Sequence, residues 1–210
     1  MLGPVAVVVD HPLVAERLTR LRDKTTKRAE FRRNLAELTT FLVYESLRDQ
    51  PVVVIEIDTP MAPTKGVSVA GPPIVVPVMR AGLGMLDATL TLIPNARVGF
   101  VGVRRDEETF MPHAYVNTVP EHLAGRRVLV LDPMLATGGS LIHTCQLLRH
   151  AAAGHMTVVC VLASLQGIAA FEEEGFDATV YTASIDSRLN ENAFIVPGLG
   201  DAGDRQFGLA

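Results

Sequence analysis

The chain has little cysteine, no excess of basic residues and no long apolar run. Two cysteines among 210 residues exclude a disulfide framework and a zinc site of the usual ligand spacing. Acidic residues number 23 and basic residues 19, and the resulting net charge of −4 argues against a main role in gripping nucleic acid. No run approaches the roughly 20 apolar residues of a membrane span, and the start lacks the features of a secretory signal. We therefore expect a cytoplasmic protein with no membrane or nucleic-acid partner.

What the chain does have is enough apolar sequence for one core, with 48% hydrophobic residues, so we expect a single domain over residues 1–210. Short β-branched runs alternate with helical segments, and these runs lie at 5–9, 52–57, 74–78, 98–103, 128–131 and 158–163. The alternation predicts an α/β fold with a mostly parallel twisted sheet flanked by helices. Cys145 and Cys160 fall within these patterns and are predicted to be small core residues.

Two helices are predicted near the start of the chain. Residues 26–48 carry a stripe of apolar side chains and form an amphipathic packing element; the stripe consists of Phe31, Leu35, Leu38, Leu42 and Leu47. Residues 12–22 begin with a proline at a first helical turn. Because both helices precede most of the strand and helix repeats, we expect them to contribute to a subunit contact.

Two other segments break the alternation. Residues 104–120 are polar between strand-like ends, which predicts a projecting hairpin, or flap. The segment at about 190–210 contains IVPGLGDAGDRQFG, in which four glycines and a proline exclude a regular element. Flaps often cover ligand sites, so we expect a site nearby.

The sharpest local signal is VLVLDPMLATGGSLIHTCQLL at residues 128–148, where a strand ends in an acid and a small-residue turn enters a helix. Backbone N–H groups of residues 136–140 can converge on one anion, and the helix dipole favours negative charge there. Gly138 and Gly139 permit close approach. Asp132, at the strand end, can accept hydrogen bonds from sugar hydroxyls. The alternative is a tight strand-to-helix connection without a ligand.

These residues support a family resemblance. LDPMLATGGS at 131–140 resembles the phosphoribosyl pyrophosphate (PRPP) loop of type I phosphoribosyltransferases, and its Asp-Pro pair resembles the uracil phosphoribosyltransferases in particular. PVMRAGLGM at 77–85 resembles the diphosphate loop of that family, and residues 195–208 resemble its uracil-binding C-terminus. With HPL at 11–13 and RLN at 188–190, the resemblance extends along essentially the whole chain.

The resemblance implies a glycosyltransferase that moves phosphoribose from PRPP to N1 of uracil, giving UMP and diphosphate in pyrimidine salvage. The residues implied for PRPP binding are Arg80, Arg105, Asp132, Pro133, Met134, Leu135, Ala136, Thr137, Gly138, Gly139, Ser140 and Asp201. Main-chain groups would bind uracil at Ile195, Gly200, Asp201 and Ala202. The catalytic residues implied are Arg80, Arg105 and Asp201.

Arginine suits a diphosphate because its planar group stays charged and meets two phosphate oxygens at once. We assign Arg105 rather than Arg104 because Asp106 completes the Arg-Asp pair of the family. The cofactor implied is Mg²⁺, held mainly by PRPP and water, with Asp201 as the candidate protein ligand. Whether Asp201 also accepts the N1 proton stays open, and we expect that it is not a strong base.

Departures and alternatives remain at this point. Phe194 stands where the family usually has Tyr, and Leu165 and Gln166 stand where Pro and Glu are more usual. Family members are commonly dimers or larger, so we expect a homo-oligomer, and GTP is a candidate effector. A regulator that binds UMP and an RNA leader is one alternative, although the basic residues of 17–33 alternate with acids. An enzyme for another base is the second alternative.

Overall fold

A computed structural model describes residues 5–105 and 112–208, and its centre is an eight-stranded sheet of order β1-β10-β9-β7-β4-β5-β6, with β8 beside β9. The strands are β1 (Ala6–Val8), β4 (Ile74–Met79), β5 (Val101–Arg105), β6 (Pro112–Asn117), β7 (Val128–Leu131), β8 (Met134–Leu135), β9 (Met156–Ser164) and β10 (Ala178–Asp186). Neighbouring strands are parallel except β5 and β6, which pair antiparallel. The predicted α/β class and mostly parallel sheet are confirmed.

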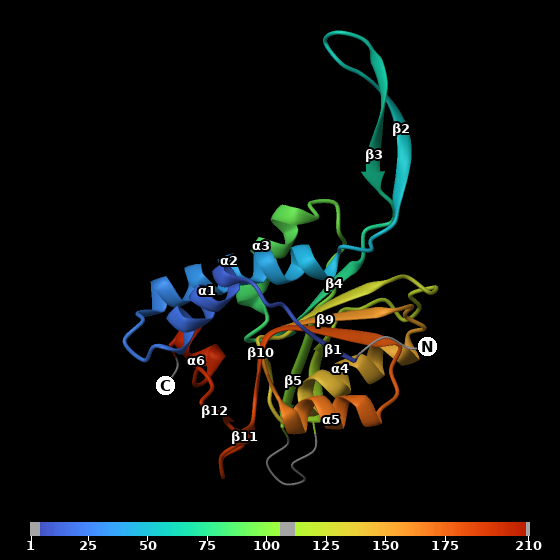
Figure 1. Ribbon diagram of the computed structural model, residues 1–210. Helices are drawn as coiled ribbons and strands as arrows, with labels where there is room; N and C mark the ends of the chain where they lie inside the picture. The colour runs from blue at the N-terminus through green and yellow to red at the C-terminus, as the bar shows by residue number, and fades with distance from the viewer. Residues whose placement is uncertain (1–4, 106–111, 209–210) are drawn as a thin grey trace.

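One predicted strand lies outside this sheet. β2 (Val52–Asp58) pairs antiparallel with β3 (Pro63–Val69), and this hairpin, the arm, projects from the body of the protein (Figure 1). The prediction that residues 52–57 join the parallel sheet is therefore wrong. Every residue of β2 is exposed, although the run is as apolar as the buried strands. An apolar run indicates that the side chains of a strand favour burial, but it does not show which part of the protein, or which other chain, buries them.

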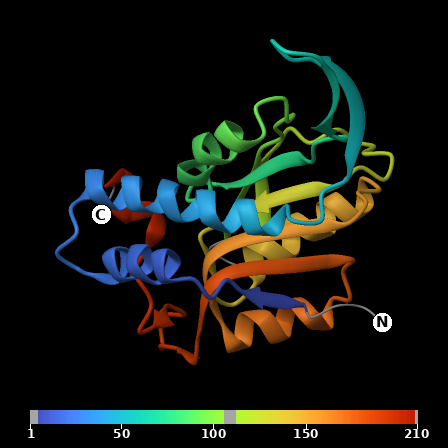
Figure 2. The same cartoon turned by 45° about the horizontal axis from the view of Figure 1, so that its top comes forward.

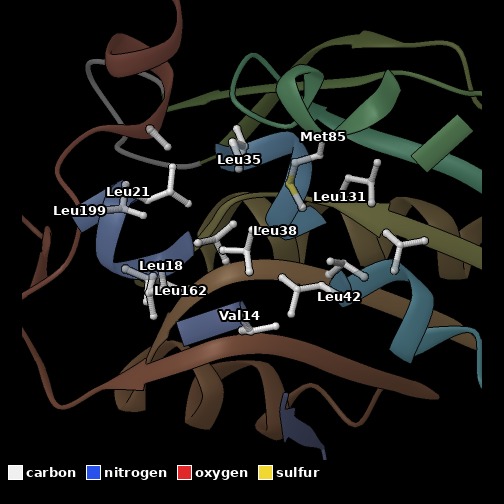
Figure 3. Close-up of a cluster of buried hydrophobic side chains, with 14 of the residues drawn as sticks. Val14, Leu18, Leu21, Leu35, Leu38, Leu42, Met85, Leu131, Leu162 and Leu199 are labelled. Atoms are coloured by element: carbon white, nitrogen blue, oxygen red, sulfur yellow. The ribbon is translucent and has the colours of Figure 1, made fainter. Parts of the chain in front are cut away.

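Helices cover both faces of the sheet (Figures 1 and 2). On one face lie α1 (Pro12–Arg22), α2 (Arg28–Ser46) and α3 (Leu83–Leu92), and on the other lie α4 (Gly139–His150) and α5 (Leu165–Glu173). Figure 3 shows the core of the first face, where side chains of α1 and α2 meet the sheet. Four residues of the predicted stripe are fully buried there, namely Phe31, Leu35, Leu38 and Leu42. The stripe therefore packs against the core of its own chain. The expected subunit contact of these helices stays a prediction.

The second face has a core of its own under α4 and α5. Cys145 and Cys160 are buried in it as free thiols, and burial raises the pKa of each to about 12. Their prediction as core residues is confirmed. Among the residues that the structure describes, no helix combines the length and apolar character needed to cross a membrane.

The C-terminal segment is attached to the C-terminal end of α1 and to the first turn of α2. A two-stranded unit of β11 (Arg188–Leu189) and β12 (Ile195–Val196) leads into the short helix α6 (Ala202–Phe207). The guanidinium group of Arg205 lies 4.3 Å from the ring centre of Phe31 and donates to the Leu199 carbonyl at 2.8 Å. It also donates to the carbonyl of Leu21. These contacts fix a glycine-rich segment that has little regular structure.

Candidate active site

Residues 132–140, the anion loop, lie at the carboxyl end of β7. Gly138 caps α4 with a φ of 90°, a left-handed conformation that favours glycine. The N–H groups in the first turn of α4 have no partner within the helix and are therefore available to a ligand at this end of the helix. The hydroxyl-bearing residues Thr137 and Ser140 lie at the same helix end. This is the arrangement that the sequence predicts for binding an anion.

Side chains of the next strand and helix support the anion loop from behind. The Ser164 hydroxyl donates to the Ala136 carbonyl at 2.6 Å and accepts from the Gly167 N–H at 2.8 Å. A Cβ at Gly167 would collide with the carbonyls of Ala136 and Leu135. Leu135 is fully buried, so only its main chain can face a ligand. Sequence reasoning missed this support, although a serine before a helical pattern is a recognisable N-cap signal.

Asp132 is the buried acid of the site, and the residue is only 8% exposed. Burial raises its pKa to about 7, and a hydrogen bond from the Met134 N–H at 3.3 Å opposes that rise. The neutral and ionised forms are thus close in free energy at pH 7. Donors such as sugar hydroxyls favour the ionised form, because they hydrogen-bond to the carboxylate.

Arg80 reaches the same sheet edge from the neighbouring strand. It directly follows β4, which pairs with β7, and it is exposed. Gly82 lets its segment pack against the end of β7, since a Cβ there would collide with the Leu131 carbonyl. The Gln206 side chain donates to the Ala81 carbonyl at 3.1 Å and so connects this segment to α6. Sequence reasoning did not find Gln206.

The C-terminal segment bends tightly before α6. Gly198 and Gly200 have φ values of 62° and 80°, both left-handed. A Cβ at Gly198 would collide with the Ile195 carbonyl, so the turn there requires glycine. Asp201 is the N-cap of α6, and its Oδ1 accepts from the Asp204 N–H at 2.8 Å. The capping role of Asp201 was not predicted.

The anion loop and the C-terminal segment enclose one cleft of about 370 Å³. The residues that line it are Met134, Ala136, Thr137, Ser140, Asn192, Ala193, Phe194, Ile195, Gly200, Asp201 and Ala202. The other predicted loop residues, Asp132, Pro133, Leu135, Gly138 and Gly139, are not part of the lining. Arg80 is not part of the lining either. The Arg105 side chain and Asp106 lie outside the described residues.

Comparison with known proteins agrees with this geometry. A family model described as uracil phosphoribosyltransferase matches residues 8–209. A uracil phosphoribosyltransferase of Corynebacterium diphtheriae is 50% identical over 201 residues, covering 96% of this chain and 95% of that protein. The chain belongs to the uracil phosphoribosyltransferase family. The resemblance inferred from the sequence is therefore confirmed.

Solved structures extend the comparison to the fold of the uracil phosphoribosyltransferase family. The AQ2163 protein of Aquifex aeolicus is 37% identical with a TM-score of 0.89, covering 98% of this chain and 99% of that one. An adenine phosphoribosyl transferase of Trypanosoma brucei, solved with AMP, pyrophosphate and ribose-5-phosphate, has a TM-score of 0.54 at 13% identity, covering 95% of this chain and 89% of that one. The second likeness shows the fold of type I phosphoribosyltransferases.

The departures from the family pattern have definite places. Phe194 lines the cleft and is 42% exposed, so its ring can pack against a ligand. Its N–H donates at 2.9 Å to Oδ1 of Asn190, the last residue of the RLN motif. Leu165 and Gln166 are the first residues of α5, next to the N-cap Ser164 that supports the anion loop. They can affect the support of the loop but do not line the binding site.

The carboxylates at the site fit a Mg²⁺ ion that is shared with substrate phosphates, and they do not form a metal site made of protein ligands alone. Among residues 5–105 and 112–208, no group of three or more His, Cys, Asp and Glu is placed to hold a metal ion. Asp201 lines the cleft and is exposed, and Asp132 is buried directly after β7, outside the lining. Mg²⁺ needs only one or two carboxylates when substrate phosphates and water complete its shell.

Proposed function

We propose that this cleft transfers phosphoribose from PRPP to N1 of uracil and releases diphosphate, giving UMP for pyrimidine salvage. The observation that carries this proposal is the single cleft of about 370 Å³ enclosed by the anion loop and the C-terminal segment. The transfer requires the phosphoribose and the base in one site, in contact with each other. Family membership makes the chain a phosphoribosyltransferase, and the cleft brings both half-sites within reach.

Uracil recognition rests on main-chain groups. Along one edge uracil presents a carbonyl, an N–H and a second carbonyl, so its pocket must offer donor, acceptor and donor in that order. We propose that the main chain of Ile195, Gly200, Asp201 and Ala202 supplies them, and all four residues line the cleft. Cytosine would place its amine opposite a donor and leave buried polar groups unpaired, which disfavours it strongly.

PRPP binding divides between the two sheet-edge loops. We propose that main-chain N–H groups of residues 136–140 bind the 5′-phosphate and that Asp132 accepts from the ribose hydroxyls. Arg80 meets the diphosphate, at the end of the strand next to β7. Arg105 follows from the resemblance alone, and we propose that residues 104–120 form a flap that brings it over the diphosphate and excludes water.

Catalysis then consists of orientation and charge stabilisation. The anomeric carbon gains positive character as diphosphate leaves, so arginines close to the leaving oxygens lower the barrier. Asp201 would help PRPP oxygens and water to hold Mg²⁺, which would neutralise part of the diphosphate charge when bound. Asp201 uses Oδ1 to cap α6, which supports a positioning role rather than that of a strong base.

Diphosphate release from PRPP tests the proposal directly. Purified protein is supplied with PRPP and Mg²⁺ and with uracil, cytosine, hypoxanthine or orotate in parallel. We expect release with uracil only. Release with hypoxanthine or orotate would support an enzyme for another base, and no release with any base would contradict the transferase assignment.

The arm supports a homo-oligomer. Its exposed apolar side chains are Val52, Val53, Val54, Ile55, Ile57, Met61, Val67 and Val69, with Met61 at 93% exposure. A two-stranded hairpin is at best marginally stable alone in water, so these side chains need a covering surface. At the base of the arm lies a hollow of about 340 Å³ with an apolar lining that includes Tyr44, Leu47 and Ile93. We propose that the arms and hollows of two copies of this chain cover each other, as a symmetric dimer requires.

Light scattering during gel filtration tests the oligomer. We expect Val54→Lys to shift the protein toward monomer, because it places a charge on the apolar surface of the arm. Ser68→Lys changes an exposed polar residue of the same hairpin and serves as the matched control. A dimeric Val54→Lys protein would contradict the proposal.

The other finer expectations stay predictions. The cytoplasmic location and a GTP effector rest on the sequence and the resemblance, and activity measured with and without GTP tests the second. The regulator alternative loses support, because Arg17, Arg20 and Arg33 pair with glutamates rather than forming an open basic face. Filter binding with a pyrimidine leader RNA distinguishes the two functions.

A further inference from the structure

An ion pair lies behind the uracil-binding segment, and neither of its partners lines the cleft. Arg22 is the last residue of α1, and Asp186 is the last residue of β10. Their contact is bidentate, with Nη1 to Oδ2 at 2.7 Å and Nη2 to Oδ1 at 2.6 Å. Ser184 joins them, since its hydroxyl accepts from Arg22 at 3.3 Å and donates to Asp186 at 3.2 Å.

Both members of the pair hold Gly198. Arg22 Nη1 donates to the Gly198 carbonyl at 2.9 Å, and Asp186 Oδ2 accepts from the Gly198 N–H at 2.9 Å. The donor and the acceptor of one residue are thereby fixed by opposite charges. Gly198 stands in the left-handed turn between Ile195 and Gly200. Rotating the Gly198 peptides would therefore re-aim the main-chain groups on either side of it.

The burial of Asp186 argues for a role in geometry. Asp186 is only 6% exposed and the Arg22 side chain is 24% exposed, and an ion pair with a buried partner is on balance a weak source of stability, because desolvation offsets the attraction. Charge-assisted hydrogen bonds with bidentate geometry are, however, strongly directional. Arg17 and Arg20, which precede Arg22 on α1, pair with glutamates of the two N-terminal helices. Arg22 instead reaches the C-terminal segment at Gly198, whereas Arg32 of α2 donates to the Gln206 carbonyl at 2.8 Å and Arg205 to the Leu199 carbonyl.

We propose that Arg22 and Asp186 are positioning residues for uracil, which clamp Gly198 so that the main chain from Ile195 to Ala202 presents its donors and acceptor in the correct order. This inference rests on the proposed role of the segment in binding uracil. It assigns specificity to two side chains that touch neither substrate. The anion loop, which we propose binds the 5′-phosphate, does not depend on them, because it is supported separately by Ser164 and Gly167.

Steady-state kinetics of Arg22→Met and Asp186→Asn test the proposal. Each variant loses charge-assisted bonds to Gly198, and we expect the KM for uracil to rise about 10-fold or more, with the KM for PRPP within about 2-fold of wild type. The double variant should resemble the single variants, because both act through Gly198. Arg22→Lys keeps the charge without the planar fork and should restore part of the affinity.

An equilibrium measurement separates positioning from general damage. UMP contains the base and ribose 5-phosphate lacks it. The variants should therefore bind UMP about 10-fold more weakly than wild type, and their affinity for ribose 5-phosphate should equal that of wild type. Asp177→Ala removes the exposed contact with His155, which touches neither the cleft nor the hollow, and serves as the control without an effect. Ser184→Ala, a milder change, keeps the ion pair and should raise the KM for uracil by about 2- to 5-fold, which provides a test if the charge variants do not fold.

The outcomes are distinct. A wild-type protein that does not use uracil refutes the proposed function. If the wild type is active, two results refute the positioning role. One is that all variants, Ser184→Ala included, keep the wild-type KM for uracil. The other is that they lose affinity for uracil and PRPP equally.

Discussion

Asp132 carries a pH-dependent prediction, because its carboxyl group is buried at the end of β7. Burial raises its pKa from 3.8 to about 7. Since the folded-state pKa lies above the unfolded value, the folded protein holds this proton more tightly than the unfolded chain does. The resulting contribution to stability is complete below pH 3.8 and is lost as the pH rises through about 7. At alkaline pH the ligand-free protein therefore contains a buried carboxylate that destabilises it.

We expect Asp132→Asn to remove this loss. A rise of roughly three pKa units corresponds to about 4 kcal/mol between low and high pH, of which about 3 kcal/mol develops between roughly pH 5 and pH 8. In a chain of this size, about 1 kcal/mol changes the Tm by roughly 2–4 °C. The Tm of Asp132→Asn minus that of wild type should thus increase by roughly 6–12 °C over this pH range.

Calorimetry of the ligand-free proteins across this pH range measures the difference. Asp87→Asn, an exposed carboxylate of α3, is the control and should follow the wild-type profile. The same Asp132→Asn protein should have a raised KM for PRPP, because an amide replaces the carboxylate that accepts from the ribose hydroxyls. Parallel Tm profiles for Asp132→Asn and wild type would refute the reasoning.

Three further substitutions examine how the site is held. Ser164→Ala leaves the Ala136 carbonyl without its buried donor, and calorimetry should show a loss of about 1–3 kcal/mol together with a raised KM for PRPP; an unchanged Tm would contradict the support of the anion loop. Gln206→Met keeps the volume but removes the bond to the Ala81 carbonyl, so inhibition by diphosphate should weaken severalfold, and unaltered inhibition would mean that α6 does not hold the diphosphate loop. Phe194→Tyr adds a hydroxyl to a half-exposed ring in the cleft; we expect the KM for uracil to fall by about 2- to 10-fold with no change in Tm, and a KM that rises would show that the pocket excludes this hydroxyl.

The parts of the fold and site that follow from contiguous residues could be predicted. The apolar stripe of residues 26–48 identifies α2, because helical periodicity is a local property. The turn at Gly138 requires a left-handed residue whatever surrounds it. The family motifs are contiguous as well, so the anion loop and the glycine-rich C-terminal segment were found as separate pieces.

Placement of the arm shows where such prediction ends. β2 and the buried strands are equally rich in valine and isoleucine, yet β2 is exposed along its whole length. β10, which lies inside the sheet between β1 and β9, was missed because polar residues interrupt its apolar pattern. Which strand becomes buried depends on the elements that pack against it, and those lie far away in the sequence.

The sequence by itself determined the motifs of this protein and its family: an acid before a small-residue turn, the arginines that we propose for the diphosphate, and the glycine-rich segment that we propose for uracil. Only the tertiary structure decided that the anion loop and the C-terminal segment share a cleft, and that Arg22 joins Asp186 across 164 positions to hold Gly198. The physical reason is that backbone conformation is set by neighbouring residues, whereas contacts between charges and carbonyls distant in the chain exist only after the sheet and its helices have packed.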